Sequence, residues 1–338
     1  MSEIYNPWEE NEISIKANGG TELIKRKLGS LVDKDLASHF QVICSRVRQL
    51  HEDKIRIYWV HDLPNDNETN HIKNKASRDR FHKIVFCGHW QYNQYMNGLQ
   101  LPYDDKIAVI ENAIEPIANH KKDFTDGINL CYLSTPHRGL ELLIPTFFEL
   151  IKTRPSLKLH VYSSFAIYGN QAADAHPRFQ RLFETCKNHP NIVYHGSVSN
   201  DQLRQDLQKM HILAYPSIWP ECNSIMLMES MSAGLIAVHP NFAGLSDTSG
   251  GLTIQYQYHD DATTHAKRFY HALDAACAQV VEDQTQEYLQ FVKVYADLRF
   301  SIDKAAIAWT ALMQALLSQV GTNRALPIPE PVFSYSPQ

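Results

Sequence analysis

Short runs of apolar, often β-branched residues alternate along the chain with longer stretches in which apolar residues recur at helical spacing. This alternation is typical of βαβ units, in which helices join parallel strands, and it predicts an α/β fold. The runs form two series. The first consists of FQVIC at 40–44, IRIYWV ending at Val60, KIVFC at 83–87 and KIAVI at 106–110, and the second of INLCYL at 128–133, LKLHVY at 157–162, NIVYHG at 191–196, HILAYP at 211–216 and GLIAVH at 234–239.

The polar stretch IANHKKDFTD at 117–126 separates the two series, and 338 residues exceed what one hydrophobic core usually supports. We therefore predict two Rossmann-like, doubly wound domains that face a central cleft, where the carboxyl ends of parallel strands bind ligands. The predicted divisions are an N-terminal domain at 1–122, a C-terminal domain at 123–302, a helix at about 303–320 that packs back on the first domain, and an irregular tail at 321–338.

Composition argues against several classes of protein. A net charge of -5 gives no general attraction to nucleic acid or anionic lipid. The polar, acidic start MSEIYNPWEE is unlike a secretory signal, and no apolar run approaches membrane-spanning length, so we expect a cytoplasmic protein with at most peripheral membrane contact. The 6 cysteines form no CxxC pair and the 17 histidines show no ligand spacing, so we expect a reducing compartment and no metal site.

Two glutamates follow the predicted strand HILAYP. Glu221 and Glu229 are eight positions apart, so they would lie on one side of a helix that starts at Glu221, with the N–H groups of Asn223, Ser224 and Ile225 open to phosphate oxygens. A helix-end acid and an exposed helix acid would more often explain such a pair. Glu229, however, lies in the apolar stretch IMLMESMSAG, where an acid needs a partner that offsets its desolvation, and a ribose diol is such a partner.

The stretch CYLSTPHRGLELL at 131–143 predicts a strand, a polar turn and a helix start. Ser134, Thr135 and the cation Arg138 would then offer donors and a positive charge to a diphosphate. An ordinary surface arginine beside a polar turn is the alternative.

Two features of the first series of strands also indicate a ligand site. Gly19 and Gly20 precede the helical pattern LIKRKLGSLV, with ISI at 13–15 as the strand before them, and adjacent glycines let the backbone approach an anion, although such a pair is more often a plain turn. His61 directly follows a predicted strand and would face the cleft, although a lone histidine is more often structural.

The segment YPSIWPECNSIMLMESMSAG resembles glycosyltransferase family 4, whose hallmark is a Glu, seven residues and a second Glu, followed by Ala-Met-Ala-x-Gly. CYLSTPHRGL is similar to the Ser-x-Pro-x-Arg-Gly-Leu motif of one branch of that family. VIENAIEP at 109–116 resembles its interdomain turn, and NFAGLSDTSGG at 241–251 resembles its Gly-x-Leu-x-Glu-Thr loop. The resemblance spans about residues 18 to 310, and Asn223 and Ser224 stand where the family usually has an aromatic residue and a glycine.

The resemblance implies a GT-B fold and a retaining, metal-independent transferase that moves a sugar from a nucleotide-diphosphate sugar to a glycan or other hydroxyl acceptor. A UDP-sugar is the expected donor and GDP-mannose the second choice, with no further cofactor. Arg138, Glu221 and His61 would take the catalytic roles: Arg138 neutralises the leaving group, Glu221 contacts sugar hydroxyls and His61 touches the sugar or acceptor. Glu229 would bind the ribose, and the other implied donor-binding residues are Gly19, Gly20, Ser134, Thr135, Tyr162, Val198, Asn223, Ser224 and Ile225.

Three functions remain open at this stage. The acceptor is a saccharide or lipid-linked glycan in the first. In the second the acceptor is a hydroxylated base of DNA, which requires a basic groove. Only a few cations could begin such a groove, namely Lys25, Arg26, Lys27, Arg46 and Arg48. In the third the chain binds a sugar nucleotide without catalysis, which the presence of both glutamates and Arg138 disfavours.

Overall fold

The computed structural model describes residues 5–9, 19–101, 105–118 and 120–328. The chain divides into two compact units. Unit 1 comprises Met1–Ala113 and Ile302–Gln338, and unit 2 comprises Ile114–Ser301. The division lies before the predicted boundary at residue 122, so the polar stretch 117–126 belongs to unit 2.

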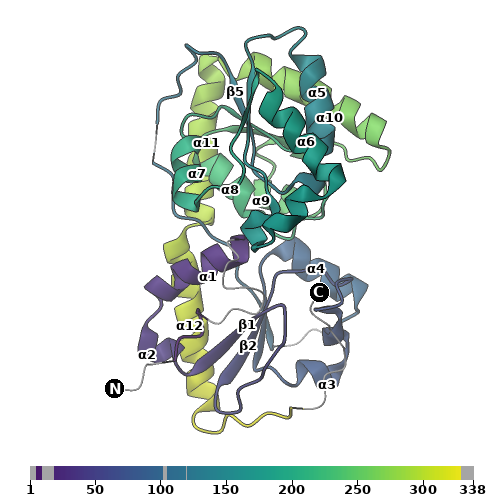
Figure 1. Cartoon of the computed structure of the whole chain (residues 1–338). Helices are drawn as coiled ribbons and strands as arrows, with labels where there is room; N and C mark the ends of the chain where they lie inside the picture. Colours follow the sequence, from purple (N-terminus) through teal and green to yellow (C-terminus); the bar gives the residue numbers. More distant parts are fainter. Residues whose placement is uncertain (1–4, 10–18, 102–104, 119, 329–338) are drawn as a thin grey trace. The chain divides into compact units, whose positions relative to one another are not determined.

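Unit 1 is built on four parallel strands in the order β1-β2-β3-β4 (Figure 1). Every strand predicted at 40–110 is confirmed, and the expected strand at 13–15 lies outside the described residues. Trp59 on β2 meets Trp309 on α12 with ring centroids 4.9 Å apart, so the last long helix is part of this unit's core. The elements are β1 (Phe40–Cys44), β2 (Ile55–Val60), β3 (Lys83–Phe86), β4 (Ile107–Val109), α1 (Gly20–Leu31), α2 (Lys34–Ala37), η1 (Asn70–Lys73), α3 (Lys75–Arg78), α4 (His89–Gly98) and α12 (Ile302–Val320).

Unit 2 is built on six parallel strands in the order β10-β9-β8-β5-β6-β7. This strand order is that of a doubly wound sheet. Helices α5, α6 and α10 lie on one side of the sheet, and α7, α8 and α11 lie on the other (Figure 1). The strands are β5 (Asn129–Tyr132), β6 (Lys158–Val161), β7 (Ile192–Tyr194), β8 (Ile212–Ala214), β9 (Ile236–Pro240) and β10 (Ile254–Tyr256). The helices are η2 (Pro136–Arg138), α5 (Leu140–Leu150), η3 (Phe165–Tyr168), η4 (Gln171–Ala175), α6 (Pro177–Asn188), α7 (Asn200–Leu207), α8 (Ile225–Ser232), α9 (Leu245–Ser249), α10 (Ala262–Gln279) and α11 (Asp283–Arg299).

The predicted α/β class and the five predicted strands of the second series are confirmed. The sequence did not reveal β10, because its three residues include Gln255 and lack a continuous apolar run. The central strands read as apolar runs because helices cover both faces of a parallel sheet, and β8 is buried throughout.

The order of strands in unit 2 reverses between β5 and β8. These two strands are neighbours in the sheet, although three α/β connections lie between the end of β5 at Tyr132 and the start of β8 at Ile212. In doubly wound sheets ligands bind at the carboxyl ends of the strands beside such a reversal. The loops after β5 and β8 are therefore where a functional site is expected.

Five of the six cysteines are buried and Cys222 is partly exposed. Across the described ranges, no helix combines the length and apolar character needed to cross a membrane.

Candidate functional site in unit 2

The turn after β5 reaches the loop after β8 through a glycine. Gly139 has a φ of 142°, and a Cβ atom there would lie 2.3 Å from the carbonyl oxygen of Pro216. The N–H of Ile218 donates to the carbonyl of the neighbouring Arg138 at 3.1 Å. Only glycine permits this close approach of the two backbones. Gly139 therefore sets the position of the Arg138 backbone beside the loop after β8.

Arg138 forms an ion pair with Glu221. Its Nη1 lies 2.8 Å from Oε1 of Glu221, and the hydroxyl of Tyr215 donates to the same oxygen at 2.6 Å. Burial by itself would lower the pKa of Arg138, but Glu221, Tyr168 and Tyr215 together outweigh it and the pKa is raised. Burial and then Glu221 raise the pKa of Tyr215. Arg138 therefore stays a cation and Tyr215 a neutral donor.

Two aromatic side chains contact the Arg138 guanidinium. Its Nη2 donates to the hydroxyl of Tyr168 at 3.0 Å, and its Cζ lies 5.3 Å from the ring centroid of Trp219. The His137 ring stacks on Phe165 with centroids 5.4 Å apart and meets Trp219 edge-on at 5.0 Å. Burial and then Arg138 lower the pKa of His137 to about 4, so its ring is neutral at pH 7.

Four buried polar atoms in the loops after β5 and β6 have no hydrogen-bond partner among the described residues. They are Oγ1 of Thr135, Nδ1 of His137, Nε of Arg138 and Oγ of Ser163. Thr135 and Ser163 are only 4% and 2% exposed. Buried polar groups are normally paired, so this group favours a polar ligand at the site. Ser163 was not among the predicted site residues, although the pair Ser163 and Ser164, shortly after the predicted strand LKLHVY, was a usable signal.

The predicted helix start at Glu221 is wrong. Helix α8 begins at Ile225, and Glu221 lies in the irregular segment before it. The first carbonyl that accepts an N–H of α8 is that of Ser224, which bonds to the N–H of Met228 at 3.1 Å. The loop before α9 supports the segment that contains Glu221: the N–H of Gly244 donates to the carbonyl of Glu221 at 2.8 Å. Glu221 and Glu229 therefore do not share one side of a helix.

Asn223 and Ser224 are buried against α9. Oγ1 of Thr248 accepts the N–H of Ser224 at 3.2 Å and lies 3.5 Å from Nδ2 of Asn223. The prediction that the N–H of Ser224 is open to phosphate is therefore wrong, because the chain already pairs it. Ile225 follows as the first residue of α8.

Glu229 is 5% exposed, which rules out the alternative that it is an exposed helix acid. Its Oε1 accepts from Nδ2 of Asn200 and from Nη1 of Arg204, both at 3.2 Å. Asn200 and Arg204 of α7 therefore offset part of the desolvation of the Glu229 carboxylate. Arg204 was not among the predicted site residues, and its only signal in the sequence was a cation in the first helix after the predicted strand NIVYHG.

Two further predicted donor-binding residues lie near the ends of β6 and β7. The Tyr162 hydroxyl donates to Oδ2 of Asp206 at 3.0 Å, and its ring stacks on His195 with centroids 4.1 Å apart. Nδ1 of His160 lies 3.0 Å from Nε2 of the same His195. Val198 is partly exposed in the loop between β7 and α7, and Ser134 is partly exposed after β5.

Unit 1 holds the other predicted residues. Gly19 caps α1 and Gly20 is its first residue. His61 follows β2, its N–H donates to Oγ of Ser45 at 2.8 Å, and its buried Nε2 has no partner within the described part of the chain. Burial, and then Lys25 and Arg46, lower the pKa of His61 to about 3, so the ring is neutral at pH 7.

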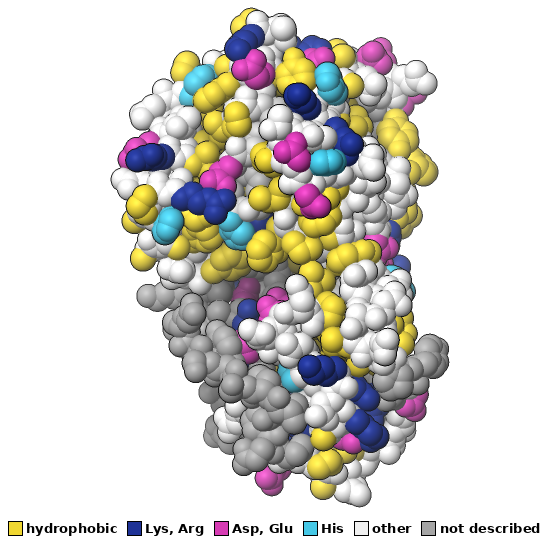
Figure 2. Space-filling view, turned by 90° about the vertical axis from the view of Figure 1, so that its right-hand side faces the viewer, with side chains coloured by type: hydrophobic (Ala, Val, Ile, Leu, Met, Phe, Trp, Pro, Cys, Tyr) yellow, Lys and Arg dark blue, Asp and Glu magenta, His cyan; other side chains and the backbone are white. Residues whose placement is uncertain are grey.

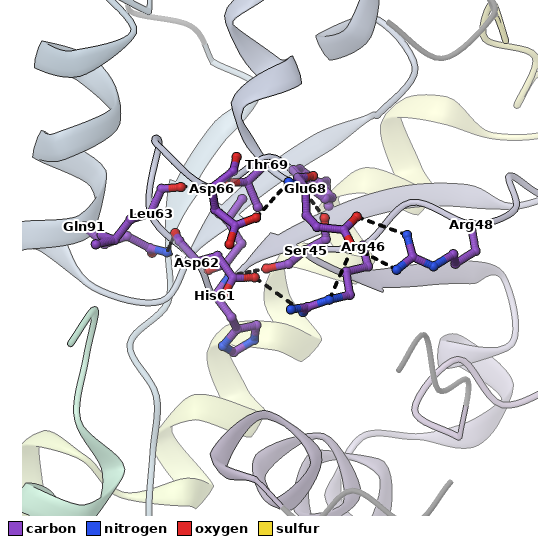
Figure 3. A network of polar contacts seen from close by, with 12 residues as sticks. Ser45, Arg46, Arg48, His61, Asp62, Leu63, Asp66, Glu68, Thr69 and Gln91 are labelled. Carbon is purple, nitrogen blue, oxygen red and sulfur yellow. Dashed lines mark hydrogen bonds and ion pairs between the residues drawn. The ribbon is translucent and has the colours of Figure 1, made fainter. Parts of the chain in front are cut away.

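The arginines beside His61 are paired with acids. Figure 3 shows Arg46 between Asp62 and Glu68, at 3.5 and 3.6 Å, and Arg48 in a two-bond contact with Glu68 at 2.9 and 3.0 Å. The His61 ring points away from this network (Figure 3). Two of the cations that would begin a basic groove are therefore neutralised.

Charge is mixed on the surface of unit 2 as well. On its face in the upper part of Figure 2, acidic, basic and histidine side chains are interspersed. Within the described ranges, no group of three or more His, Cys, Asp or Glu side chains is placed to hold a metal ion.

Comparison with known proteins shows which family and which solved structures the chain is similar to. Residues 128–283 match the family model described as Glycosyl transferases group 1. This range includes β5, β8, Arg138, Glu221 and Glu229. The matched range lies within unit 2, so unit 2 carries a segment similar to a glycosyltransferase group 1 domain. None of the curated proteins compared with the chain matches it significantly.

Solved structures share the fold of the whole chain. A glycosyltransferase from Rickettsia africae ESF-5 is similar with a TM-score of 0.61 at 13% identity, covering 91% of this chain and 83% of that one. Anabaena HepE, in complex with UDP and glucose, has a TM-score of 0.56 at 11% identity, covering 88% and 77%. The pneumococcal O-GlcNAc transferase GtfA, in complex with UDP and GlcNAc, has a TM-score of 0.58 at 15% identity, covering 79% of this chain and 53% of that longer one.

The glycosyltransferase therefore has the GT-B fold, and both the predicted fold and the predicted enzyme class are confirmed. Membership of family 4, the retaining mechanism and the individual residue roles stay predictions.

Proposed function

We propose that this glycosyltransferase transfers a hexose from a nucleotide-diphosphate donor to a saccharide acceptor with retention of configuration. The observation that carries the proposal is the Arg138–Glu221 pair at the strand reversal of unit 2, in loops where four buried polar atoms have no partner among the residues that the structure describes. A UDP-sugar is the first donor to test and GDP-mannose the second, since similar structures hold UDP with glucose or GlcNAc.

The donor diphosphate is assigned to the loop after β5. Arg138 supplies the fixed charge, and Oγ1 of Thr135 and Nε of Arg138 supply donors that have no partner among the described residues. Ser134 and the helix start at Ile225 complete this group. Glu221 takes sugar hydroxyls and Glu229 takes the ribose, which joins Asn200 and Arg204 on that carboxylate.

The remaining predicted residues receive supporting roles. Tyr162 and Val198 border the base, while Asn223 and Ser224 shape the sugar side through their contacts with Thr248. Gly19, Gly20 and His61 keep the roles that the family resemblance assigns to them. His61 acts as a neutral hydrogen-bonding group, because its lowered pKa keeps the ring uncharged at pH 7.

In the proposed reaction the bond between the anomeric carbon and the diphosphate oxygen breaks, and a bond to the acceptor oxygen forms on the same face of the sugar. The acceptor proton passes to the leaving diphosphate. Arg138 stabilises the negative charge that grows on that leaving group, so its contribution is larger in the transition state than in the bound donor. No metal ion is required.

A saccharide or lipid-linked glycan is favoured over DNA as acceptor because Arg46 and Arg48 are paired with Asp62 and Glu68. A duplex needs cations that neutralise phosphates. We place the reaction in the cytoplasm, with at most peripheral membrane contact.

The first experiment is a thermal-shift screen of UDP-, GDP- and ADP-sugars, since a ligand that binds the folded state raises its apparent stability. A donor that gives a shift is then assayed for hydrolysis and transfer in the wild type, Arg138→Lys and Glu221→Gln. Arg154→Lys is the matched control, because Arg154 also pairs with a carboxylate of unit 2, Asp274, at 2.7 Å.

We expect both site variants to lose at least about a hundredfold in kcat, the scale of removing one oriented charge-stabilising donor, and the control to keep full activity. Turnover that survives both substitutions would refute the assigned site. Donor binding without any turnover would instead support the non-catalytic alternative.

A further inference from the structure

The loop between β6 and α6 reaches the guanidinium of Arg138 with a single tyrosine. Tyr168 is the last residue of η3, and its hydroxyl accepts Nη2 of Arg138 at 3.0 Å. The Tyr168 side chain is otherwise near the surface, at 37% exposure. No sequence motif predicted that this loop contacts Arg138.

The loop is held in shape by its own hydrogen bonds. Ser164 caps η3 by accepting the N–H of Ala166 at 2.9 Å. Oδ1 of Asp174 accepts the N–H of Phe165 at 2.8 Å, and Oδ2 of the same carboxylate accepts the Ser164 hydroxyl. Asp174 thus ties the two ends of the segment that carries Tyr168.

Three contacts fix the plane of the Arg138 guanidinium. Glu221 holds Nη1, Tyr168 holds Nη2 and the Trp219 ring lies against one side. The remaining edge, Nε, is buried without a partner among the described residues. Because a guanidinium is rigid and planar, fixing both Nη atoms also fixes the direction of the Nε–H bond.

We infer that Tyr168 is a positioning residue for the transfer reaction, which orients Arg138 so that Nε–H is directed at the leaving diphosphate. The inference rests on the proposed function. Tyr168 acts through Arg138 and is assigned no contact with the sugar or the acceptor. Its loss leaves the guanidinium charge in place but removes one of the two hydrogen bonds that set its orientation.

The main test is Tyr168→Phe, which deletes one oxygen atom and keeps the ring. We expect kcat to fall about tenfold, the scale of one hydrogen bond to a charged group, while KM for the donor changes less than about twofold, because orientation matters most in the transition state. Asp174→Ala, which releases η3, is expected to lower kcat in the same direction. Tyr288→Phe is the control, because Tyr288 also bonds through its hydroxyl, to the Leu252 carbonyl at 3.2 Å, on α11.

A double-mutant cycle separates positioning from a merely structural role. A lysine at position 138 cannot bond to Glu221 and Tyr168 with a fixed plane, so Tyr168→Phe is expected to change kcat less than twofold in the Arg138→Lys background. Equal losses in both backgrounds, or an unchanged kcat in the single variant while wild type turns over, would overturn the inference and leave the proposed function intact.

A measurement without turnover tests the geometry directly. Trp219 is one of 5 tryptophans, so a chain labelled with 5-fluorotryptophan gives resonances that Trp219→Phe assigns. Tyr168→Phe is expected to shift the Trp219 resonance alone, because the guanidinium against that ring is released, and Tyr288→Phe to shift none. An unmoved Trp219 resonance would count against the inference even if no donor were found, whereas a shift in a chain that binds no nucleotide sugar would refute only the proposed function.

Discussion

Gly139 is the residue whose replacement tests most sharply how the fold builds the site. Its φ of 142° is a backbone conformation that L-residues rarely adopt, and a Cβ atom would lie 2.3 Å from the Pro216 carbonyl oxygen and 2.9 Å from its carbon. The atoms in the way are backbone, so no side chain can rotate aside. Gly139→Ala must therefore move the loop after β8 or the turn after β5.

The cost has two parts. The unfavourable backbone conformation costs about 1–3 kcal/mol, and a displaced backbone segment in a packed interior adds a comparable amount, so we expect about 3–4 kcal/mol of lost stability. Gly251 isolates the first part, since its φ is 77° and a Cβ atom there would meet nothing within 4 Å. Gly251→Ala should cost about 1 kcal/mol.

The two variants are compared by urea denaturation followed by circular dichroism, with thermal shift as a second probe. The same displacement separates Arg138 from Glu221, so Gly139→Ala should also lose donor binding, whereas Gly251→Ala should keep it. Equal destabilisation of the two variants would refute the argument, because it would mean that the contact with Pro216 contributes nothing to the fold.

Three further predictions concern single contacts. Thr248→Val leaves the N–H of Ser224 buried and unpaired, so the free energy of unfolding measured in urea should fall by about 1–3 kcal/mol. Arg204→Leu leaves the Glu229 carboxylate with less compensation and should cost about 2–3 kcal/mol, part of which Glu229→Gln in the same chain should restore. Burial lowers the pKa of His239 to about 4, so between pH 6.5 and 4 the unfolded state binds a proton that the folded state does not, and stability should fall by about 1.4 kcal/mol per unit of acidification from this group. The fall in Tm on acidification should be shallower in His239→Asn, and an identical slope would contradict this assignment.

The sequence predicted the strands of both units because buried parallel strands must be continuously apolar, and this signal is local. β10 was missed because an edge position with only three residues does not need such a run. The start of α8 was misplaced for a different reason. An acid four residues before Ile225 looks like a helix-start acid, whereas the Glu221 carbonyl accepts the N–H of Gly244 in another loop instead of an N–H of the helix.

The candidate site was predictable as a set of residue identities but not as a set of contacts. Arg138 and Glu221 are 83 positions apart, and nothing in their neighbourhoods states that one pairs with the other. They meet because β5 and β8 are neighbours at the strand reversal and because Gly139 lets the two following loops touch. Arg204 and Tyr168 were missed for the same reason, since each is an unremarkable polar residue until the sheet brings its loop to Glu229 or to Arg138.

These contacts also distinguish the two glutamates of the motif. Glu229 is held by α7 through Asn200 and Arg204, so its position is set whether or not a ligand is bound. Glu221 instead shares one oxygen between Tyr215 and the very cation assigned to the leaving group. The carboxylate assigned to the sugar hydroxyls therefore also holds the guanidinium assigned to the leaving diphosphate. Substitution of Glu221 should accordingly alter both sugar recognition and the charge available to the leaving group, whereas substitution of Glu229 should weaken donor binding with a smaller effect on kcat.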